Sequence, residues 1–263
     1  MEELPLPSSD NRGKLFIVGI GPGRVEQLTG KAKDAIRASD IIIGNDFYLH
    51  QIESLVENQE IIQSSMGKEV ERARACVKLA HEKIVCMVSG GDPGVYGMAS
   101  IVLEVLERDN SCIEYEVIPG VTAATAAASR AGSPLSGDYV TLSLSDLLTP
   151  WEIIEKRMNL AFQMGVPVAV YNPKSRGRPD NLAQALSIAR TYLDKDTPVV
   201  VVKNAFRDEQ EVRFFTLESL FADDQFVDMR SIVIIGGEES RMGTICGKQQ
   251  MITPRGYDRK YVY

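Results

Sequence analysis

The hydrophobic pattern of the first half of the chain consists of short apolar runs separated by longer segments with helical spacing. Apolar runs at residues 15–20, 41–43, 84–88 and 115–118 are typical of buried strands. Between and after them we expect helices over residues 29–38, within residues 45–57, and over residues 68–81, 96–106 and 119–132, with Thr29 as the first cap. This alternation of strand and helix predicts a parallel sheet with helices on its faces.

The second half of the chain repeats this style, although no sequence repeat links the two halves. Strands are predicted at residues 139–144, 166–171, 199–202 and 232–235, and helices at residues 150–164 and 181–193. Thr149, Pro150 and Glu152 have the spacing of a capping box at the start of the first of these helices. Asp180 is the expected cap of the second helix. The predicted fold class is therefore α/β.

Ser133 and Pro134 interrupt the chain between the two halves. We therefore expect a loose tail over residues 1–13, an N-terminal α/β domain over residues 14–132 and a C-terminal α/β domain over residues 133–263. Both sheets are expected to be mostly parallel. A small ligand is expected in the cleft between the domains, where proteins with two α/β domains usually bind one.

Composition narrows the classes of function. The 263 residues are 44% hydrophobic and 25% charged, which is typical of a soluble globular protein. The balance of 29 basic and 36 acidic residues gives a net charge of −7, which argues against nucleic acid as the main partner. No apolar run has the length needed to span a bilayer, and the polar N-terminus does not resemble a signal peptide. We therefore expect a cytoplasmic protein without a membrane partner.

The cysteines and histidines do not form a metal-binding pattern. The 4 cysteines are far apart, contain no CxxC pair and are accompanied by only 2 histidines. This usage predicts a reducing compartment and no metal site made by the protein.

The segment SGGDPGVYG, residues 89–97, follows a predicted strand and precedes a predicted helix. Ligands of open α/β sheets bind at such carboxyl ends of strands. Gly90 and Gly91 permit close approach of the backbone to a ligand, and Asp92 adds a carboxylate that would repel a polyanion. Two interpretations stay open at this point. The segment is either a loop for a ligand without phosphate, or a tight turn in which Asp92 caps the helix.

The glycine-rich segment GIGPG, residues 19–23, is not a dinucleotide-binding fingerprint. Arg24 occupies the position of the third glycine, and Pro22 removes a backbone N–H where a pyrophosphate needs donors. The spacing to Gly30 and Lys31 also differs from that of a Walker loop. This segment either contacts a ligand that lacks phosphate or serves as a tight turn.

Polar and basic residues follow the predicted strands of the second half. Ser143, Ser145 and Asp146 lie at the carboxyl end of one strand, and Asp146 is a candidate to orient or protonate a substrate, or else a turn residue. The basic residues at strand ends predict a rim for a substrate with several carboxylates, or else a solvated charged loop. These basic residues are Lys174, Arg176, Arg178, Lys203, Arg207 and Arg255.

The two histidines are weaker candidates. His50 lies beside Tyr48 and is a candidate proton donor, with a surface position as the alternative. His81 ends a predicted helix, where a cation interacts favourably with the helix dipole, and is expected to be structural.

Six of these motifs together resemble the tetrapyrrole methylase family. They are GIGPG, SGGDPGVYG, PGVTAATAAA, SLSDLLTPW, YNPKSRGR and MITPRGY, and they extend over residues 15–257. The first two are typical of the whole family. The last three resemble more narrowly its branch of C17-methyltransferases, which act on precorrin-3B or its cobalt form in vitamin B12 biosynthesis.

The resemblance implies two α/β domains, a homodimer, and S-adenosylmethionine bound in the cleft between the domains. The positions that would contact the cofactor are Pro22, Gly90, Gly91, Asp92, Val95, Thr122, Ala123, Tyr171, Asn204, Ala205 and Thr253. The positions that would bind the tetrapyrrole carboxylates are Lys174, Arg176, Arg178 and Arg255. Asn45 departs from the family, whose members often carry an aromatic residue there, which affects the expected detail of the substrate pocket.

The implied chemistry is methylation of C17 followed by ring contraction to precorrin-4 or cobalt-precorrin-4. For the first step the enzyme mainly supplies proximity and orientation. The second step needs a proton to move at an oxygen, and the candidates are Asp146, Ser143 and His50. Any cobalt would belong to the substrate.

Three other functions remain as alternatives. A methyltransferase of the same fold would act on another tetrapyrrole carbon or on a diphthamide precursor, but the basic loop at Lys174 to Arg178 favours a polycarboxylate. A nicotinamide-dependent oxidoreductase is disfavoured by the failed fingerprint at Arg24. A non-catalytic corrinoid-binding module is disfavoured by the complete set of expected cofactor positions.

Overall fold

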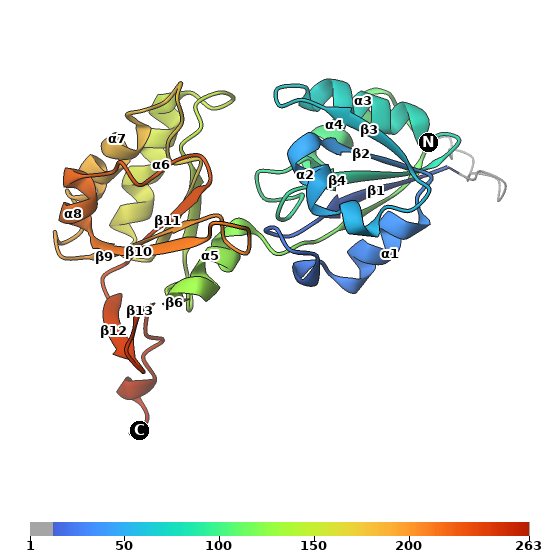
Figure 1. Ribbon diagram of the computed structural model, residues 1–263. Coiled ribbons are helices and arrows are strands. Elements are labelled where there is room, and N and C mark those ends of the chain that lie inside the picture. Colours follow the sequence, from blue (N-terminus) through green and yellow to red (C-terminus); the bar gives the residue numbers. More distant parts are fainter. Residues whose placement is uncertain (1–12, 263) are drawn as a thin grey trace. The chain divides into compact units, whose positions relative to one another are not determined.

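A computed structural model describes residues 13–262, and the chain divides in it into one unit that ends at Thr122 and a second that begins at Ala123 (Figure 1). Apart from Gly13, the predicted tail lies outside the described residues. The division precedes the boundary predicted after residue 132. It does so because the small-residue helix α5 (Ala123–Ala131) packs on strands of the second unit.

The first unit contains a five-stranded sheet in the order β3-β2-β4-β1-β5, and every pairing in it is parallel. The four predicted strands are confirmed. The fifth, β3, was not predicted because it is a largely exposed edge strand without an apolar run. The strands are β1 (Lys14–Gly19), β2 (Ile41–Asn45), β3 (Glu60–Ser64), β4 (Ile84–Ser89) and β5 (Glu114–Ile118).

Helices cover both faces of this sheet because successive strand residues point to opposite sides. Ile17 and Met87 pack with α3 and α4 on one face, whereas Val18 and Val88 pack with α1 and the segment after β2 on the other. Thr29 caps α1 as predicted, since its side chain accepts a hydrogen bond from the Ala32 N–H at 3.1 Å. The helices are α1 (Gly30–Ala38), α2 (Asp46–Gln51), α3 (Glu69–Leu79) and α4 (Ala99–Arg108), with single 3-10 turns at Val25–Gln27 and Glu53–Leu55.

The second unit contains a five-stranded sheet in the order β10-β9-β11-β8-β7. The expectation of mostly parallel sheets is wrong for this unit, because only the β7–β8 pairing is parallel. β11 inserts antiparallel between β8 and β9, and β10 returns antiparallel along the outer edge of β9. The strands are β7 (Val140–Ser143), β8 (Val168–Tyr171), β9 (Pro198–Lys203), β10 (Glu211–Thr216) and β11 (Ser231–Ile235).

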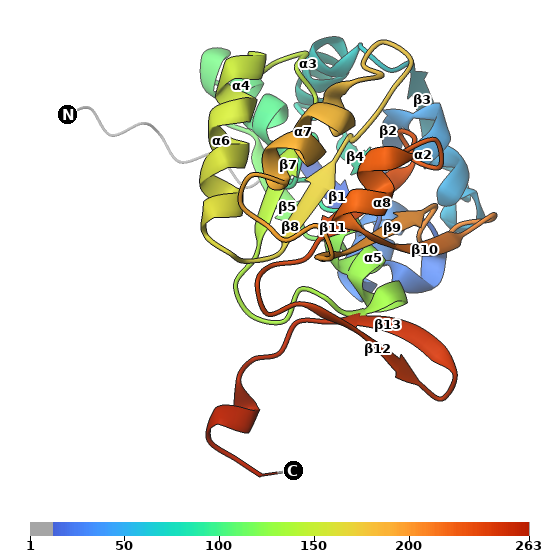
Figure 2. The same ribbon diagram turned by 90° about the vertical axis from the view of Figure 1, so that its left-hand side faces the viewer.

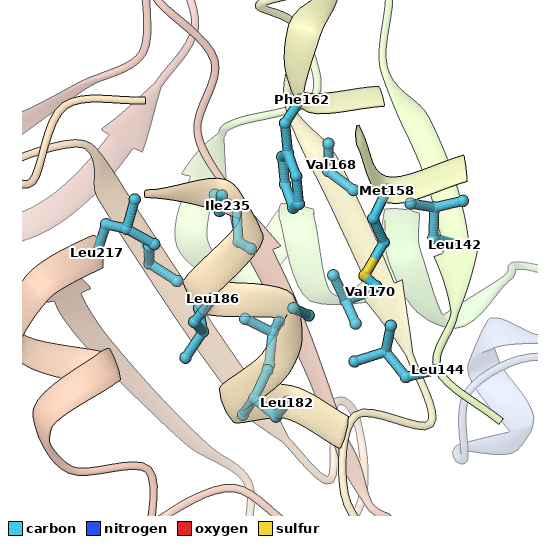
Figure 3. Close-up of a cluster of buried hydrophobic side chains, with 14 of the residues drawn as sticks. Leu142, Leu144, Met158, Phe162, Val168, Val170, Leu182, Leu186, Leu217 and Ile235 are labelled. Atoms are coloured by element: carbon cyan, nitrogen blue, oxygen red, sulfur yellow. The ribbon is translucent and has the colours of Figure 1, made fainter. Parts of the chain in front are cut away.

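The core of the second unit lies between this sheet and the helices α6, α7 and α8 (Figure 3). Phe162 and Met158 of α6 and Leu186 of α7 contact alternate strand residues such as Val168 and Val170. The remaining strand residues are buried on the other face, where α5 lies against β8, β9 and β11. The helices are α6 (Trp151–Gln163), α7 (Asn181–Ala189) and α8 (Leu217–Ala222).

The predicted capping box at α6 is wrong. Pro150 is the N-cap and its carbonyl accepts the Ile153 and Ile154 N–H groups, so Thr149 lies outside the helix and no side chain caps it. Asp180 does occupy the N-cap position of α7, although its side chain makes no capping hydrogen bond.

A small three-stranded sheet in the order β12-β13-β6 completes the second unit. Its hairpin extends away from the five-stranded sheet of the same unit (Figure 2). Cys246 and Gly247, both with positive φ, form the two-residue turn. The strands are β6 (Gly132–Ser133), β12 (Arg241–Ile245) and β13 (Lys248–Ile252), and a 3-10 turn at Tyr257–Arg259 follows.

The second unit's core yields a stability prediction. Replacing Leu186, which is 0% exposed, with Ala removes buried methyl groups and leaves a cavity, so the free energy of unfolding should fall by about 2–5 kcal/mol. The matched control is Leu160→Ala, because Leu160 is 55% exposed. Denaturant titration followed by circular dichroism measures both variants. Equal losses of stability would contradict the assigned core.

Candidate functional site

Three loops of the first unit meet at the edge where the parallel strands end. They follow β1, β4 and β5, which are adjacent in the sheet. The loops after β1 and β4 are joined directly, since Gly21 N–H donates to the Gly91 carbonyl at 3.1 Å and Gly91 N–H donates to the Gly21 carbonyl at 2.8 Å. The motifs GIGPG and SGGDPGVYG, far apart in sequence, therefore form one structure.

The glycines at this junction are required by the protein itself. A Cβ on Gly120 would lie 2.2 Å from the Gly91 carbonyl oxygen, and a Cβ on Gly19 would lie 2.6 Å from the Gly120 nitrogen. A Cβ on Gly90 would lie 2.2 Å from the ring of Tyr48. Contacts within the first unit therefore account for these glycines, whether or not a ligand also approaches them.

Asp92 connects two of these loops. One carboxylate oxygen accepts the Gly94 N–H at 2.8 Å and the other accepts the Gly120 N–H at 3.0 Å. Asp92 is not a helix cap, because α4 begins at Ala99 with Met98 as its N-cap. The alternative interpretation of the segment as a capped turn is therefore wrong.

The chemistry of this edge suits a cationic or hydroxyl-bearing ligand. An ionised carboxylate has about four acceptor positions, and the backbone amides use two of those on Asp92, which is only half-buried. The segment from Ser89 to Met98 carries no lysine or arginine, and buried Pro22 offers no N–H. These residues fit a ligand with ammonium, sulfonium or ribose hydroxyl groups better than they fit a phosphate.

In the second unit, β7, β8 and β9 end at one edge of the sheet, where β11 begins. Tyr171 lies at the end of β8, is 7% exposed, and its hydroxyl accepts the Ala124 N–H at 2.9 Å. Asn204 follows β9 with a positive φ of 51°, is 6% exposed, and donates from its backbone to the Arg230 carbonyl. Ala205 follows Asn204, and Ala123 precedes the Ala124 amide that Tyr171 binds. Four predicted cofactor positions therefore lie near this edge.

A group of hydrogen-bonded and ion-paired residues at the same edge contains two predicted catalytic residues, Ser143 and Asp146. Ser143 Oγ accepts from Asn172 Nδ2 at 2.9 Å and from the Ser145 N–H at 3.2 Å. Arg178 donates to Ser145 Oγ, and its guanidinium lies 3.9 Å from the Asp146 carboxylate. The structure thus brings Ser143, Asp146 and Arg178 together.

Sequence reasoning missed Asn172, although a signal was present. Asn172 directly follows an apolar strand and adopts a positive φ of 50°, a conformation that Asn adopts more readily than most residues. Its side chain fixes the Ser143 hydroxyl from a neighbouring strand.

The predicted basic rim is partly neutralised. Lys174 pairs with Asp224, and Lys203 lies 3.0 Å from Asp228. Burial acts to raise the pKa of Asp228, but the hydrogen bond from Lys203, the Arg230 amide and the charges of both cations hold that pKa below its usual range. Arg176 is exposed on the same loop as Lys174.

Thr253 and Arg255 lie at the opposite edge of the sheet. They line a pocket with Asp138, Pro167 and Glu238, residues that precede β7 and β8 or follow β11. Thr253 donates to the Pro134 carbonyl at 2.6 Å and is 9% exposed. The structure therefore does not bring these two predicted site residues together with Tyr171 and Asn204, because the full length of the strands separates the two edges.

The histidines have surface positions within the first unit. His50 lies on α2 with its side chain 83% exposed and Nδ1 3.2 Å from the Glu53 carboxylate. His81 is exposed just beyond α3.

Burial raises the pKa of the Cys76 thiol to about 12, so that thiol stays protonated at neutral pH. No group of three or more His, Cys, Asp or Glu side chains suited to a metal ion occurs within residues 13–262, and no helix of that range is both long and apolar enough to cross a bilayer.

The chain is similar to known methyltransferases. Residues 14–220 match the family model described as Tetrapyrrole (Corrin/Porphyrin) Methylases. The cobalamin biosynthesis protein CbiHC of Archaeoglobus fulgidus is 44% identical over 258 residues, a match that covers 98% of this chain but only 55% of the relative. The chain thus spans about half the length of that relative.

Two further relatives match along nearly their whole length. A probable cobalt-factor III C(17)-methyltransferase of Salmonella typhimurium is 41% identical over 244 residues, which is 92% of this chain and 99% of the relative. The crystal structure of the methyltransferase CobJ has a TM-score of 0.85 at 31% identity and covers 92% of this chain and 100% of its own.

The loop junction yields a second prediction. Gly120→Ala should lower the free energy of unfolding by about 1–3 kcal/mol, because the new methyl group would overlap the Gly91 carbonyl. Gly30→Ala is the control, since no atom lies within 4 Å of a Cβ placed there. Thermal unfolding compares the two variants. A Gly120→Ala protein as stable as the control would refute the close backbone contact.

Proposed function

Since the chain belongs to the Tetrapyrrole (Corrin/Porphyrin) Methylases, we propose that it methylates C17 of precorrin-3B or cobalt-precorrin-3B and contracts the ring, in cobalamin biosynthesis. The methyl donor is S-adenosylmethionine, and the product is precorrin-4 or cobalt-precorrin-4. The relatives named as C17-methyltransferases support this substrate. That the chain is a methyltransferase follows from the family itself.

The observation that carries the proposal is the carboxylate of Asp92. Two backbone amides hold it in place, acceptor positions remain on it, and no cation on its loop competes for them. S-adenosylmethionine carries a sulfonium, an ammonium and ribose hydroxyls, all of which interact favourably with a carboxylate. A dinucleotide would instead bring negatively charged phosphates to the same carboxylate, which would repel them.

The residues proposed to contact the cofactor are given for each unit separately. In the first unit they are Pro22, Gly90, Gly91, Asp92, Val95 and Thr122, and in the second they are Ala123, Tyr171, Asn204 and Ala205. Thr253 is left out of this set because its hydroxyl is bonded to Pro134 and Ser240 at the far edge of its sheet.

The tetrapyrrole is proposed to bind at the edge where β7 and β8 end. Its rim of carboxylates suits Arg178 and the exposed Arg176, and Arg178 is already oriented by Ser145 and Ser175. Its ring face suits Leu147 and Leu148, which are 77% and 97% exposed on the loop that contains Asp146. A surface that combines apolar and cationic groups in this way fits an amphipathic, carboxylate-rich ring.

The proposed roles in catalysis follow from the hydrogen bonds. The enzyme aligns the ring carbon with the methyl group and excludes water, so proximity and orientation supply most of the methylation rate. Ser143 Oγ already accepts two hydrogen bonds, which leaves its own proton to donate to a reacting oxygen. Asp146, 40% exposed and only loosely paired with Arg178, is placed to take up or release a proton during ring contraction.

His50 is the third proposed proton carrier, and its pairing with Glu53 at the surface makes it the weakest of the three. The homodimer that the resemblance implies and the cytoplasmic location expected from composition and cysteine usage belong to the same proposal. Light scattering on the purified protein measures the oligomeric state.

The cofactor assignment predicts selective binding. Isothermal calorimetry should detect binding of S-adenosylmethionine and none of NAD, and Asp92→Ala should weaken the former by about tenfold or more through loss of charge-assisted hydrogen bonds. Asp109→Ala, an exposed aspartate at the end of α4, is the control. Preferential binding of NAD would end the proposal, and unchanged affinity in Asp92→Ala would remove Asp92 from the site.

The substrate assignment predicts a selective kinetic effect. Replacing Arg176 and Arg178 together with Ala should raise the KM for the tetrapyrrole about tenfold or more, since a bidentate guanidinium–carboxylate contact is lost, and should leave the KM for the cofactor nearly unchanged. The double variant of Lys156 and Arg157, exposed on α6, controls for the loss of two charges. Steady-state kinetics with each substrate varied in turn measures this. Equal effects on both KM values would place the rim elsewhere.

A further inference from the structure

Arg72 is a buried cation in the first unit. It lies on α3, its side chain is 4% exposed, and Nε has no hydrogen-bond partner among the described residues. The nearest carboxylate is that of Glu69, at 3.6 Å, and Glu69 is 43% exposed. Moving a charge out of water with so little compensation is unfavourable, so Arg72 contributes little to stability through its charge.

The guanidinium connects segments that are distant in sequence. One terminal nitrogen donates to Ser64 Oγ and to the Ser65 carbonyl at 3.3 Å, where β3 ends. The other terminal nitrogen lies 3.6 Å from the sulfur of Met98. The planar fork of an arginine spans these acceptors in fixed directions, which the single ammonium of a lysine does not.

Met98 closes the loop that carries Asp92. Its N–H donates to Ser89 Oγ at 3.3 Å, so the first and last residues of the loop from Ser89 to Met98 are bonded to each other. The following residue, Ala99, donates to the Pro93 carbonyl at 2.9 Å. The position of the Met98 side chain therefore bears on the position of the whole loop, and Arg72 contacts that side chain.

We propose that Arg72 is a positioning residue for methyl transfer, which holds the loop from Ser89 to Met98 against the end of β3 and so keeps Asp92 aligned for the cofactor. The inference rests on the proposed function for the identity of that cofactor. The part of the inference that concerns the position of the loop is independent of the proposed function. All the contacts that hold the loop lie within the first unit.

The principal test is Arg72→Met, which keeps a long side chain and removes the fork. Hydrogen exchange of the cofactor-free protein should become faster in the peptide covering residues 89–98, because Met98 loses its polar contact. The Kd for S-adenosylmethionine should rise about tenfold, which corresponds to about 1.4 kcal/mol. The KM for the cofactor should rise with it, whereas the KM for the tetrapyrrole should stay the same. Arg74→Met is the matched control, since Arg74 is exposed on the same helix.

Two further variants keep the test decisive if Arg72→Met does not fold. Met98→Leu preserves volume but removes the sulfur acceptor, and it should speed exchange of the same peptide. Arg72→Lys retains the charge without the fork and should restore little of the cofactor affinity. If Arg72→Met folds and matches Arg74→Met in exchange and in Kd, or if Met98→Leu leaves the exchange unchanged, the proposal is overturned. Failure of the unmodified protein to bind S-adenosylmethionine would instead overturn the proposed function.

Discussion

The close contact of three backbone loops at one edge of the first sheet is the constraint on which the proposed site depends. The loops after β1, β4 and β5 approach so closely that Gly91 exchanges two hydrogen bonds with Gly21 and leaves no room for a Cβ on Gly120. Asp92 joins the last two loops through their amides. A charged side chain thereby acquires a fixed position on loops, which otherwise tend to be mobile.

The two units present different chemistry at the edges where the cofactor and the tetrapyrrole are proposed to bind. The loop from Ser89 to Met98 offers a carboxylate without a cation, which suits a positively charged methyl donor. The edge where β7 and β8 end offers guanidinium groups, hydroxyls and exposed leucines, which suits an acidic macrocycle. In both places hydrogen bonds within the protein orient the key side chain before any ligand binds, which reduces the ordering that binding requires.

Much of the fold was predictable because buried strands carry apolar runs. β3 was not, because it is an exposed edge strand, and the hairpin of β12 and β13 has few buried positions. The prediction of parallel strands in the second unit is wrong because an apolar run such as β11 does not indicate which strands it pairs with. In the structure β11 pairs antiparallel with both β8 and β9. The glycine and aspartate motifs predicted loops at the ends of strands, but their contacts depend on residues far away in sequence, such as Gly120. Similarly, the sequence alone does not indicate that Thr253 and Arg255, which follow β13, lie far from Tyr171.

Transfer of a labelled methyl group tests the proposed function most directly. The protein would be incubated with S-adenosylmethionine labelled with carbon-13 at the methyl group and with metal-free or cobalt-bound precorrin-3B. Mass spectrometry and NMR of the product should then locate one labelled methyl group at C17 of a contracted ring. A label at another ring carbon, or no label on either the metal-free or the cobalt-bound tetrapyrrole, would contradict the account.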